Sequence, residues 1–156
     1  MYSNEIVCKI LMYIDKNIND RITIKDLSDK FFYNRYYIMK LFKKEMDMTI
    51  VDYINSVKIY NSLKLLKQSN NKMLNVALNS GFNSLEYYSE IFKKIVGESP
   101  KQVSSYFNGD KKITTKQIKN INTAYVELYN LMDKKEKYLK NRIPLKLPVK
   151  TLSIFK

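Results

Sequence analysis

A pattern of residues recurs in this chain after about fifty positions. Phe42-Lys43-Lys44 returns unchanged as Phe92-Lys93-Lys94. The match extends to small polar residues that stand where helices should begin: Asn34 with Ser84, and Thr49 with Ser99. Such a recurrence indicates two copies of one structural unit. Each copy should contain a short helix, a tight turn, a capped second helix, a loop and a capped third helix.

Helical spacing of apolar residues dominates positions 4–107. This period, with only three glycines and three prolines, predicts an all-α fold rather than a turn-rich β-sandwich. In each copy the short helix, the turn and the second helix form a helix-turn-helix unit, at about residues 23–45 and 72–95. The longest predicted helix, at about 50–67, joins the two units, and residues 1–107 form one predicted domain.

The two predicted turns differ in the residues that make them. In the second copy, Ala77 is small enough for two helices to cross closely, and Gly81 accepts positive φ without a Cβ clash. The corresponding residues of the first copy are Ser28 and Phe32. Because a bulky side chain at positive φ is uncommon, we expect the first turn to have a different backbone.

Basic residues outnumber acidic residues by 28 to 15, which gives a formal charge of +13. This excess suits a polyanionic partner such as nucleic acid, but a protein with a merely solvated lysine surface would show it too. Residues 108–156 hold 12 of the basic residues and 4 of the acidic ones. Charge alone therefore does not locate a binding face.

The chain has no histidine, which is the commonest general base and metal ligand, and it has no glycine-rich phosphate loop. We therefore expect no catalytic residues, no metal and no cofactor. The single cysteine, Cys8, lies in an apolar helical segment and should be a buried small hydrophobe. No apolar run approaches the ~20 residues of a membrane span, and no signal peptide is recognisable. A cytoplasmic protein with no membrane partner is the expectation.

Several spaced motifs support a more specific assignment. They are Gly81-Phe82-Asn83-Ser84, Tyr87-Tyr88-Ser89, Ile91-Phe92-Lys93-Lys94 and Gly97-Glu98-Ser99-Pro100, with Leu41-Phe42-Lys43-Lys44 in the first copy and Lys58-Ile59 and Leu65-Leu66 between them. Together they resemble the signature of the AraC/XylS family of bacterial transcription regulators, over roughly residues 4–107. The resemblance implies a seven-helix domain that places two recognition helices in major-groove segments about 34 Å apart.

The first recognition helix is predicted at Arg35 to Lys44. By the resemblance, its base-contact candidates are Tyr36, Met39 and Lys40, and the phosphate-contact candidates of this unit are Arg35, Lys43, Lys44 and the cap Thr49. A lysine can donate to guanine, and apolar groups can pack on thymine methyls. The alternative is that the lysines form a solvated face and that Tyr36 belongs partly to the core.

The second recognition helix departs from the family pattern. Its base-contact candidates are Leu85, Glu86 and Ser89, and the phosphate-contact candidates of this unit are Ser84, Lys93, Lys94 and Ser99. Glu90 stands where the family commonly has arginine, and it corresponds to Lys40. A carboxylate near phosphates is unfavourable, although glutamate can accept from cytosine. We expect weak or indirect base recognition here, and the alternative is that the glutamates face another protein such as RNA polymerase.

The chain beyond residue 107 is predicted to form a basic extension. Its apolar residues recur at heptad-like spacing over about residues 115–139: Ile118, Ile121, Tyr125, Leu128, Met132 and Leu139. An amphipathic helix of this kind must be covered, and docking on its own domain, a homodimer and another partner are all compatible with it. Leu145, Leu147 and Val149 then alternate as in an extended segment between prolines.

The combined interpretation is a sequence-specific transcription regulator, activator or repressor, that binds double-stranded DNA and has RNA polymerase as a further partner. Two alternatives stay open. One is a protein-interaction adaptor that keeps the fold but has little DNA specificity of its own. The other is a nucleoid-type protein that binds DNA through the basic extension with little sequence preference.

Overall fold

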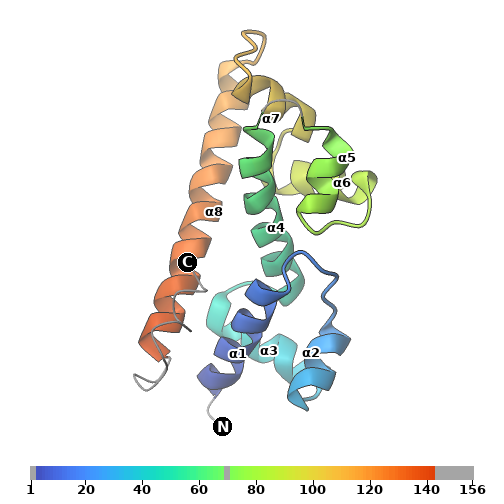
Figure 1. Cartoon of the computed structure of the whole chain (residues 1–156). Helices are drawn as coiled ribbons and strands as arrows, with labels where there is room; N and C mark the ends of the chain where they lie inside the picture. The colour runs from blue at the N-terminus through green and yellow to red at the C-terminus, as the bar shows by residue number, and fades with distance from the viewer. Residues whose placement is uncertain (1–2, 69–70, 143–156) are drawn as a thin grey trace. The chain divides into compact units, whose positions relative to one another are not determined.

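The computed structural model describes residues 3–68 and 71–142, and every regular element in that part of the chain is a helix (Figure 1). The helices are α1 (Ser3–Lys16), α2 (Ile24–Phe31), α3 (Arg35–Met46), α4 (Ile50–Leu66), α5 (Met73–Asn79), α6 (Leu85–Val96), α7 (Pro100–Phe107) and α8 (Thr115–Arg142). The predicted all-α class is confirmed. None of these helices is both long and apolar enough to cross a bilayer. The predicted extended segment at Leu145, Leu147 and Val149 lies outside the described residues.

Side-chain caps set the helix starts at the residues expected from the sequence. The Thr23 hydroxyl accepts the Asp26 N–H at 3.1 Å, and the Asp26 carboxylate accepts the Thr23 N–H at 2.8 Å, which completes a capping box. Asn34 caps α3 by accepting the Tyr36 N–H at 2.8 Å, and Ser84 caps α6 by accepting the Tyr87 N–H at 3.1 Å. These bonds satisfy amides that a helix start leaves unpaired.

The chain divides into two compact units. Over the described residues, the first contains residues 3–18, 22–54 and 131–142, and the second contains residues 19–21, 55–68 and 71–130. Each unit holds one helix-turn-helix pair, α2 with α3 in the first and α5 with α6 in the second. The long helices α4 and α8 each begin in one unit and end in the other. The basic extension is therefore not a separate body over its described residues.

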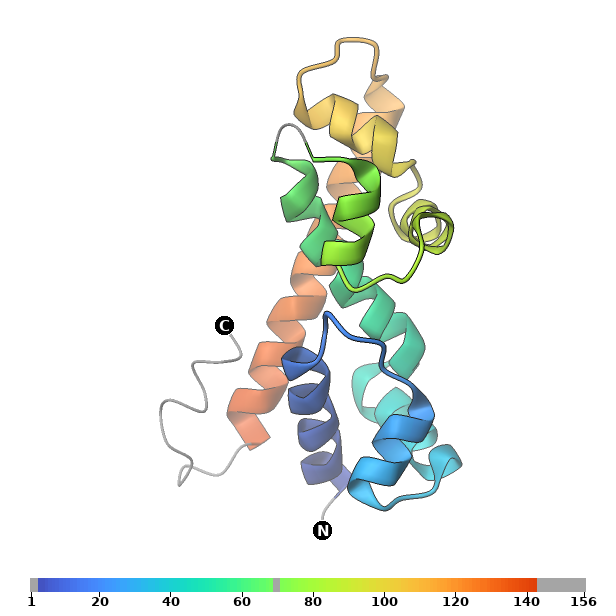
Figure 2. The same cartoon turned by 45° about the vertical axis from the view of Figure 1, so that its right-hand side comes forward.

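In the first unit, α1 and α2 both pack against α3, and the three helices lie together in both ribbon views (Figures 1 and 2). The fully buried side chains include Ile10, Ile14, Leu27, Ile38 and Phe42. The Phe42 ring meets the Tyr53 ring edge-on with centroids 5.5 Å apart. This core fixes α3 through its apolar face and leaves the opposite face exposed.

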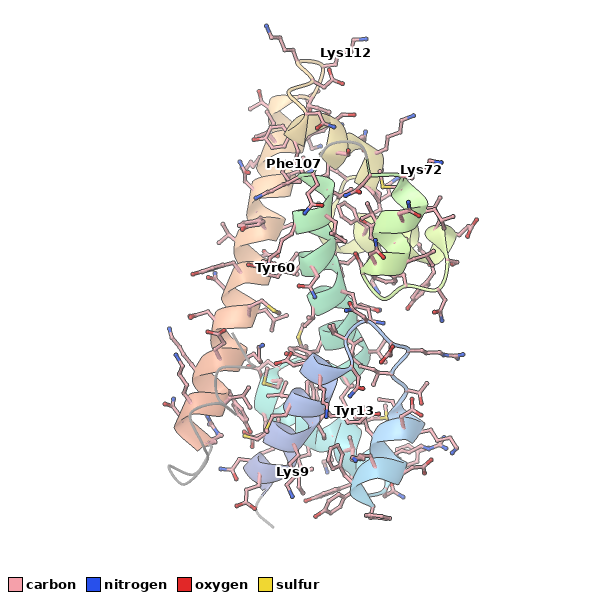
Figure 3. The ribbon with its side chains drawn as sticks, viewed as in Figure 1. Lys9, Tyr13, Tyr60, Lys72, Phe107 and Lys112 are labelled. Atoms are coloured by element: carbon pink, nitrogen blue, oxygen red, sulfur yellow. The ribbon has the colours of Figure 1, made fainter. Side chains whose placement is uncertain are left out.

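In the second unit, α5, α6 and α7 pack around the later part of α4. The core contains an aromatic row in which Tyr88 lies 5.2 Å from Phe82 and 5.6 Å from Phe92. Ile121, Ala124 and Leu128 of α8 belong to the same buried cluster. The Tyr60 ring of α4 also lies 6.0 Å from the Tyr125 ring of α8, and Figure 3 shows Tyr60 directed toward that helix.

The apolar face of α8 is thus covered by its own chain, which was one of the three open alternatives. A homodimer through this helix stays a prediction. The helix also ends at Arg142 rather than near residue 139. Lys135 and Tyr138, which the apolar spacing did not single out, are both buried.

Candidate nucleic-acid interface

The turns of the two helix-turn-helix units share one backbone pattern. Phe32 has φ 59° and ψ 40°, and Gly81 has φ 90°, so both lie at positive φ. The Tyr33 N–H donates to the Ser28 carbonyl at 3.3 Å, and the equivalent Phe82 N–H donates to the Ala77 carbonyl at 3.0 Å. The expectation that the first turn would avoid the positive φ of the second is wrong. The two turns do differ in one bond, because the Phe32 N–H donates to the Ser28 carbonyl and the Gly81 N–H donates to the Leu78 carbonyl.

The first turn tolerates Phe32 for two physical reasons. Its side chain is 92% exposed, so it meets no neighbour that would add to the steric cost at its own backbone. The Ser28 hydroxyl also donates to the Tyr33 carbonyl at 2.5 Å, a bond that Ala77 cannot make in the second turn. Surrounding bonds of this kind can hold a residue in a sparsely populated conformation.

A buried lysine supports the second turn. The Lys58 ammonium donates to the Gly81 carbonyl at 2.7 Å and to the Asp20 carbonyl at 3.0 Å. Burial lowers the pKa of Lys58. The sequence offered Lys58 only as part of the linker-helix pattern, and its contact with the turn 23 residues away had no sequence signal.

The exposed face of α3 is basic. All six of its predicted DNA-contact residues are exposed: Arg35, Tyr36, Met39, Lys40, Lys43 and Lys44. Tyr36 is 82% exposed, so the alternative that placed it partly in the core is wrong. Within the described part of the chain, no ion pair involves the four cations of this set. The helix has four basic residues against one acid, Glu45.

The exposed face of α6 is electrically balanced. Glu86 and Glu90 are exposed, as are Lys93 and Lys94, so the helix has two acids and two bases. Leu85 was expected to face outward, but it is half-buried against the core of the second unit. The first residue of a helix can turn its side chain back toward the core, and the apolar leucine gains from that contact.

Ser89 and Ser84 of the second unit are also half-buried. The Ser84 hydroxyl is engaged by the Tyr87 N–H. Of the three residues predicted to contact bases from this helix, only Glu86 is fully presented to solvent. The weak or indirect base recognition expected of this helix stays a prediction.

Two exposed tyrosines were missed from the sequence. Tyr37 on α3 and Tyr87 on α6 occupy equivalent positions of the repeat, and each is a little under half exposed. The Tyr37 ring packs 5.7 Å from Tyr33, and the Tyr87 hydroxyl accepts from the Asn55 amide at 3.3 Å. The repeat itself held the signal, because the fifty-residue offset aligns the two tyrosines.

Thr49 and Ser99 are predicted phosphate contacts, but their side-chain hydroxyls already accept hydrogen bonds from backbone amides. Thr49 Oγ1 accepts the Asp52 N–H at 3.1 Å, and Ser99 Oγ accepts the Gln102 N–H at 3.2 Å in a capping box. Any phosphate contact from these caps would therefore come from backbone amides of the first helical turn. Their assignment as DNA contacts stays a prediction.

The structure also bears on a metal site and on the reactivity of the single cysteine. In residues 3–68 and 71–142, no three His, Cys, Asp or Glu side chains are grouped to hold a metal ion. Cys8 is buried, and burial raises the pKa of its thiol to about 11, which keeps it protonated near neutral pH. This agrees with its expected role as a small core hydrophobe.

Known proteins are similar to this chain in sequence over its helix-turn-helix region. Residues 27–105 match the family model described as a helix-turn-helix domain. The bifunctional transcriptional activator/DNA repair enzyme AdaA of Bacillus subtilis is 32% identical over 117 residues, which are 71% of this chain and 56% of AdaA. The melibiose operon regulatory protein of Escherichia coli K12 is 32% identical over 96 residues, 62% of this chain and 32% of that protein. The chain thus spans about half or less of these two relatives.

A solved structure shows the same fold. The DNA-binding domain of AdpA, a global transcriptional factor crystallised with a target DNA, superposes with a TM-score of 0.62 at 14% identity, over 67% of this chain and 95% of that domain. The family model covers α3, α4, α5 and α6 in full and α2 from Leu27 onward. The chain belongs to the AraC/XylS family of helix-turn-helix proteins.

Proposed function

We propose that this chain is a regulator of transcription that binds double-stranded DNA with sequence specificity, chiefly through α3. One observation supports this most strongly. The second helix of the first helix-turn-helix unit presents four cations without ion-pair partners in the described chain, together with exposed Tyr36 and Met39. Relatives named as regulators of transcription, and a neighbour crystallised on its target DNA, support the same function.

The proposal gives the α3 side chains separate roles. Lys40 would donate to guanine O6 or N7, while Tyr36 and Met39 would pack on thymine methyl groups. Arg35, Lys43 and Lys44 would bind phosphates and set the register of the protein on the duplex. The amides that follow Thr49 would add a phosphate contact at a helix start.

The second unit would contribute mainly phosphate contacts. Lys93 and Lys94 are exposed at the end of α6, and the first turns that follow Ser84 and Ser99 offer backbone amides. Glu86 and Ser89 are the base-contact candidates that remain at the surface, since Leu85 packs against the core. A glutamate facing DNA opposes the phosphates, so we propose that this half contributes little affinity.

A second candidate function is contact with RNA polymerase or another regulator. The observation that favours it is the exposed second unit, where Glu86 and Glu90 on α6 and Leu74 and Leu78 on α5 are presented to solvent. Such a surface suits a protein partner better than it suits a polyanion. We propose no catalytic role and a cytoplasmic location, since the matched region is the helix-turn-helix domain.

The test is selection of binding sites from a random duplex library at near-physiological salt, with Lys40→Ala in parallel. Enrichment of an asymmetric site about two helical turns long is expected, because two recognition helices should cover successive major-groove segments. Lys40→Ala should relax one base position and weaken binding by about 1–3 kcal/mol. Lys119→Ala, which removes an exposed lysine of α8, is the matched control and should leave the selected site unchanged.

The alternatives give different results in the same selection. DNA retention without an enriched sequence would contradict specific regulation and point to the basic extension. No retention at all would favour the protein-contact function of the second unit. A selected site that Lys40→Ala leaves intact would contradict the role assigned to α3.

A further inference from the structure

Both recognition helices end in the same kind of turn. α3 is capped by Asp47, with φ 60°, and α6 is capped by Gly97, with φ 87°, and these residues are fifty positions apart. In each turn the amide of that residue donates back into the helix, to the Lys43 carbonyl at 2.9 Å and to the Lys93 carbonyl at 2.8 Å. The remaining carbonyls of a last helical turn have no partner within the helix.

In the first unit, α8 supplies a partner to this turn. The Lys134 ammonium donates to the Met46 carbonyl at 3.0 Å and lies 3.5 Å from the Asp47 carboxylate. A cation at the C-terminal end of a helix also interacts favourably with the helix dipole. One turn further along α8, the buried Tyr138 hydroxyl donates to the Glu45 carboxylate at 3.3 Å. The last turn of α3 is thus bonded twice from one helix.

In the second unit, the earlier part of α8 meets the equivalent turn. The Asn120 amide donates to the Glu98 carboxylate at 3.0 Å, and the Gln117 amide lies 3.4 Å from the other oxygen of the same carboxylate. A Cβ added to Gly97 would lie 3.8 Å from Asn120, which is ordinary van der Waals contact. α8 therefore passes directly against the turn that ends α6.

Buried groups hold α8 in both places. In the first unit, the Lys135 ammonium pairs with the Asp15 carboxylate of α1 at 2.9 Å, with side chains only 8% and 13% exposed. In the second unit, Ile121, Ala124 and Leu128 lie in the core cluster with Val96 and Val103. The contacts to the two turns are therefore made from a docked helix, not from a freely moving one.

We propose that α8 positions both recognition helices: Lys134 holds the C-terminal turn of α3, and Asn120 holds that of α6. The inference rests on the proposed DNA binding and deepens it. α8 lies outside residues 27–105, so the DNA affinity of this chain depends on a segment beyond the matched helix-turn-helix domain. Neither side chain has to touch DNA, because a binding group that is held loosely loses affinity even when its contacts are intact.

The experiment compares Lys134→Met with Lys137→Met in the full chain. Both remove one charge from α8, but the ion pair of Lys137 is with Asp133 of the same helix, whereas that of Lys134 is with Asp47 in the α3 turn. DNA affinity of Lys134→Met should fall about 5-fold, the size of effect expected from a coupled residue that does not touch the ligand. Lys134→Arg keeps the donor and the charge and should restore binding.

The salt dependence separates positioning from a direct phosphate contact. Loss of a phosphate contact lowers the slope of log affinity against log salt by about 0.9. Lys134→Met should lower affinity at every salt concentration and leave that slope unchanged. Lys134→Met should weaken selection in the half-site that α3 covers, and Asn120→Ala should lower affinity by less, because the half that α6 covers is proposed to contribute little. Binding is measured where circular dichroism shows each variant fully folded, so that lost stability alone cannot lower it.

Amide hydrogen exchange at Asp47 gives a measurement that needs no DNA. Faster exchange in Lys134→Met than in Lys137→Met is expected, because the turn loses its bond to α8. Equal exchange and equal affinity in the two variants would overturn the proposal, and so would a reduced salt slope. If the wild-type chain selects no site, the proposed function fails, and faster Asp47 exchange in Lys134→Met would still support the positioning contact itself.

Discussion

The two helix-turn-helix units have the same local architecture and different surface chemistry. In each, a side-chain cap starts the second helix and an equivalent hydrogen bond closes the turn. The second helix of the first unit has four bases and one acid, whereas that of the second has two of each. Caps and apolar residues fix the fold, and the exposed positions are free to differ without disturbing it.

The units also differ in how they hold α8. The first unit holds its end through a buried ion pair, Lys135 with Asp15, and through polar contacts to α3. The second holds its end mainly through apolar side chains of the core cluster. Removing one partner of a buried ion pair costs far more stability than shortening an apolar side chain in a core cluster. The first unit is therefore the more vulnerable of the two to a single substitution.

The largest expected effect is on this ion pair. Lys135→Met should destabilise the chain by about 3–5 kcal/mol at neutral pH, because Asp15 would stay buried without a partner. Leu128→Met, an apolar exchange in the second unit, should cost less than about 1.5 kcal/mol and is the matched comparison. Urea denaturation measures both. Equal costs would remove the distinction between the two ways of holding α8.

The effect of Lys135→Met should depend on pH. Burial raises the pKa of Asp15, and the nearby Lys135 charge opposes that rise. The folded state therefore binds more protons than the unfolded state between the usual and the raised pKa, and stability falls as pH rises through that window. Removing Lys135 raises this pKa further, so the gap between variant and wild type should widen from acid toward neutral pH. A gap that is constant with pH would assign the loss to packing.

The second comparison gives α6 a positive charge at the position where α3 has one. Glu90→Lys places in α6 the charge that Lys40 provides in α3. Affinity for DNA should rise, and the salt slope should steepen by about 0.9 if the new ammonium reaches a phosphate. Glu127→Lys, at an exposed position of α8, makes the same charge change as a control. Filter binding at several salt concentrations would show it, and equal gains would mean that α6 does not face DNA.

The helices and their starts could be predicted from the sequence because their causes are local. Thr23, Asn34, Ser84 and Ser99 cap the helices that follow them, and apolar spacing identified the buried faces. The basic face of α3 could also be predicted, because it consists of the residues that remain once the buried apolar residues of the helix are set aside. Local patterns of this kind are contained in any window of a few turns.

The contacts of α8 could not be predicted in this way. Lys134, Lys135 and Tyr138 bond to residues 88 to 120 positions away, and no period in the sequence relates them. In sequence a buried lysine looks like any solvated one. The predictions for Leu85 and Phe32 were wrong for a different reason. The direction of the side chain of a first helical residue depends on its tertiary surroundings, and so does the backbone strain that a turn accepts.

The smallest expected effect concerns the two turns themselves, where matched substitutions should have opposite signs. Phe32→Gly should stabilise the chain slightly, by less than about 1 kcal/mol, because it removes the cost of a side chain at positive φ and loses almost no burial. Gly81→Ala should destabilise it by about 1 kcal/mol, because Gly81 has φ 90°. Thermal denaturation of both variants measures the difference. Destabilisation by Phe32→Gly would mean that the exposed ring stabilises the first turn through a contact that its burial does not reveal, and the two turns would then be held by different forces.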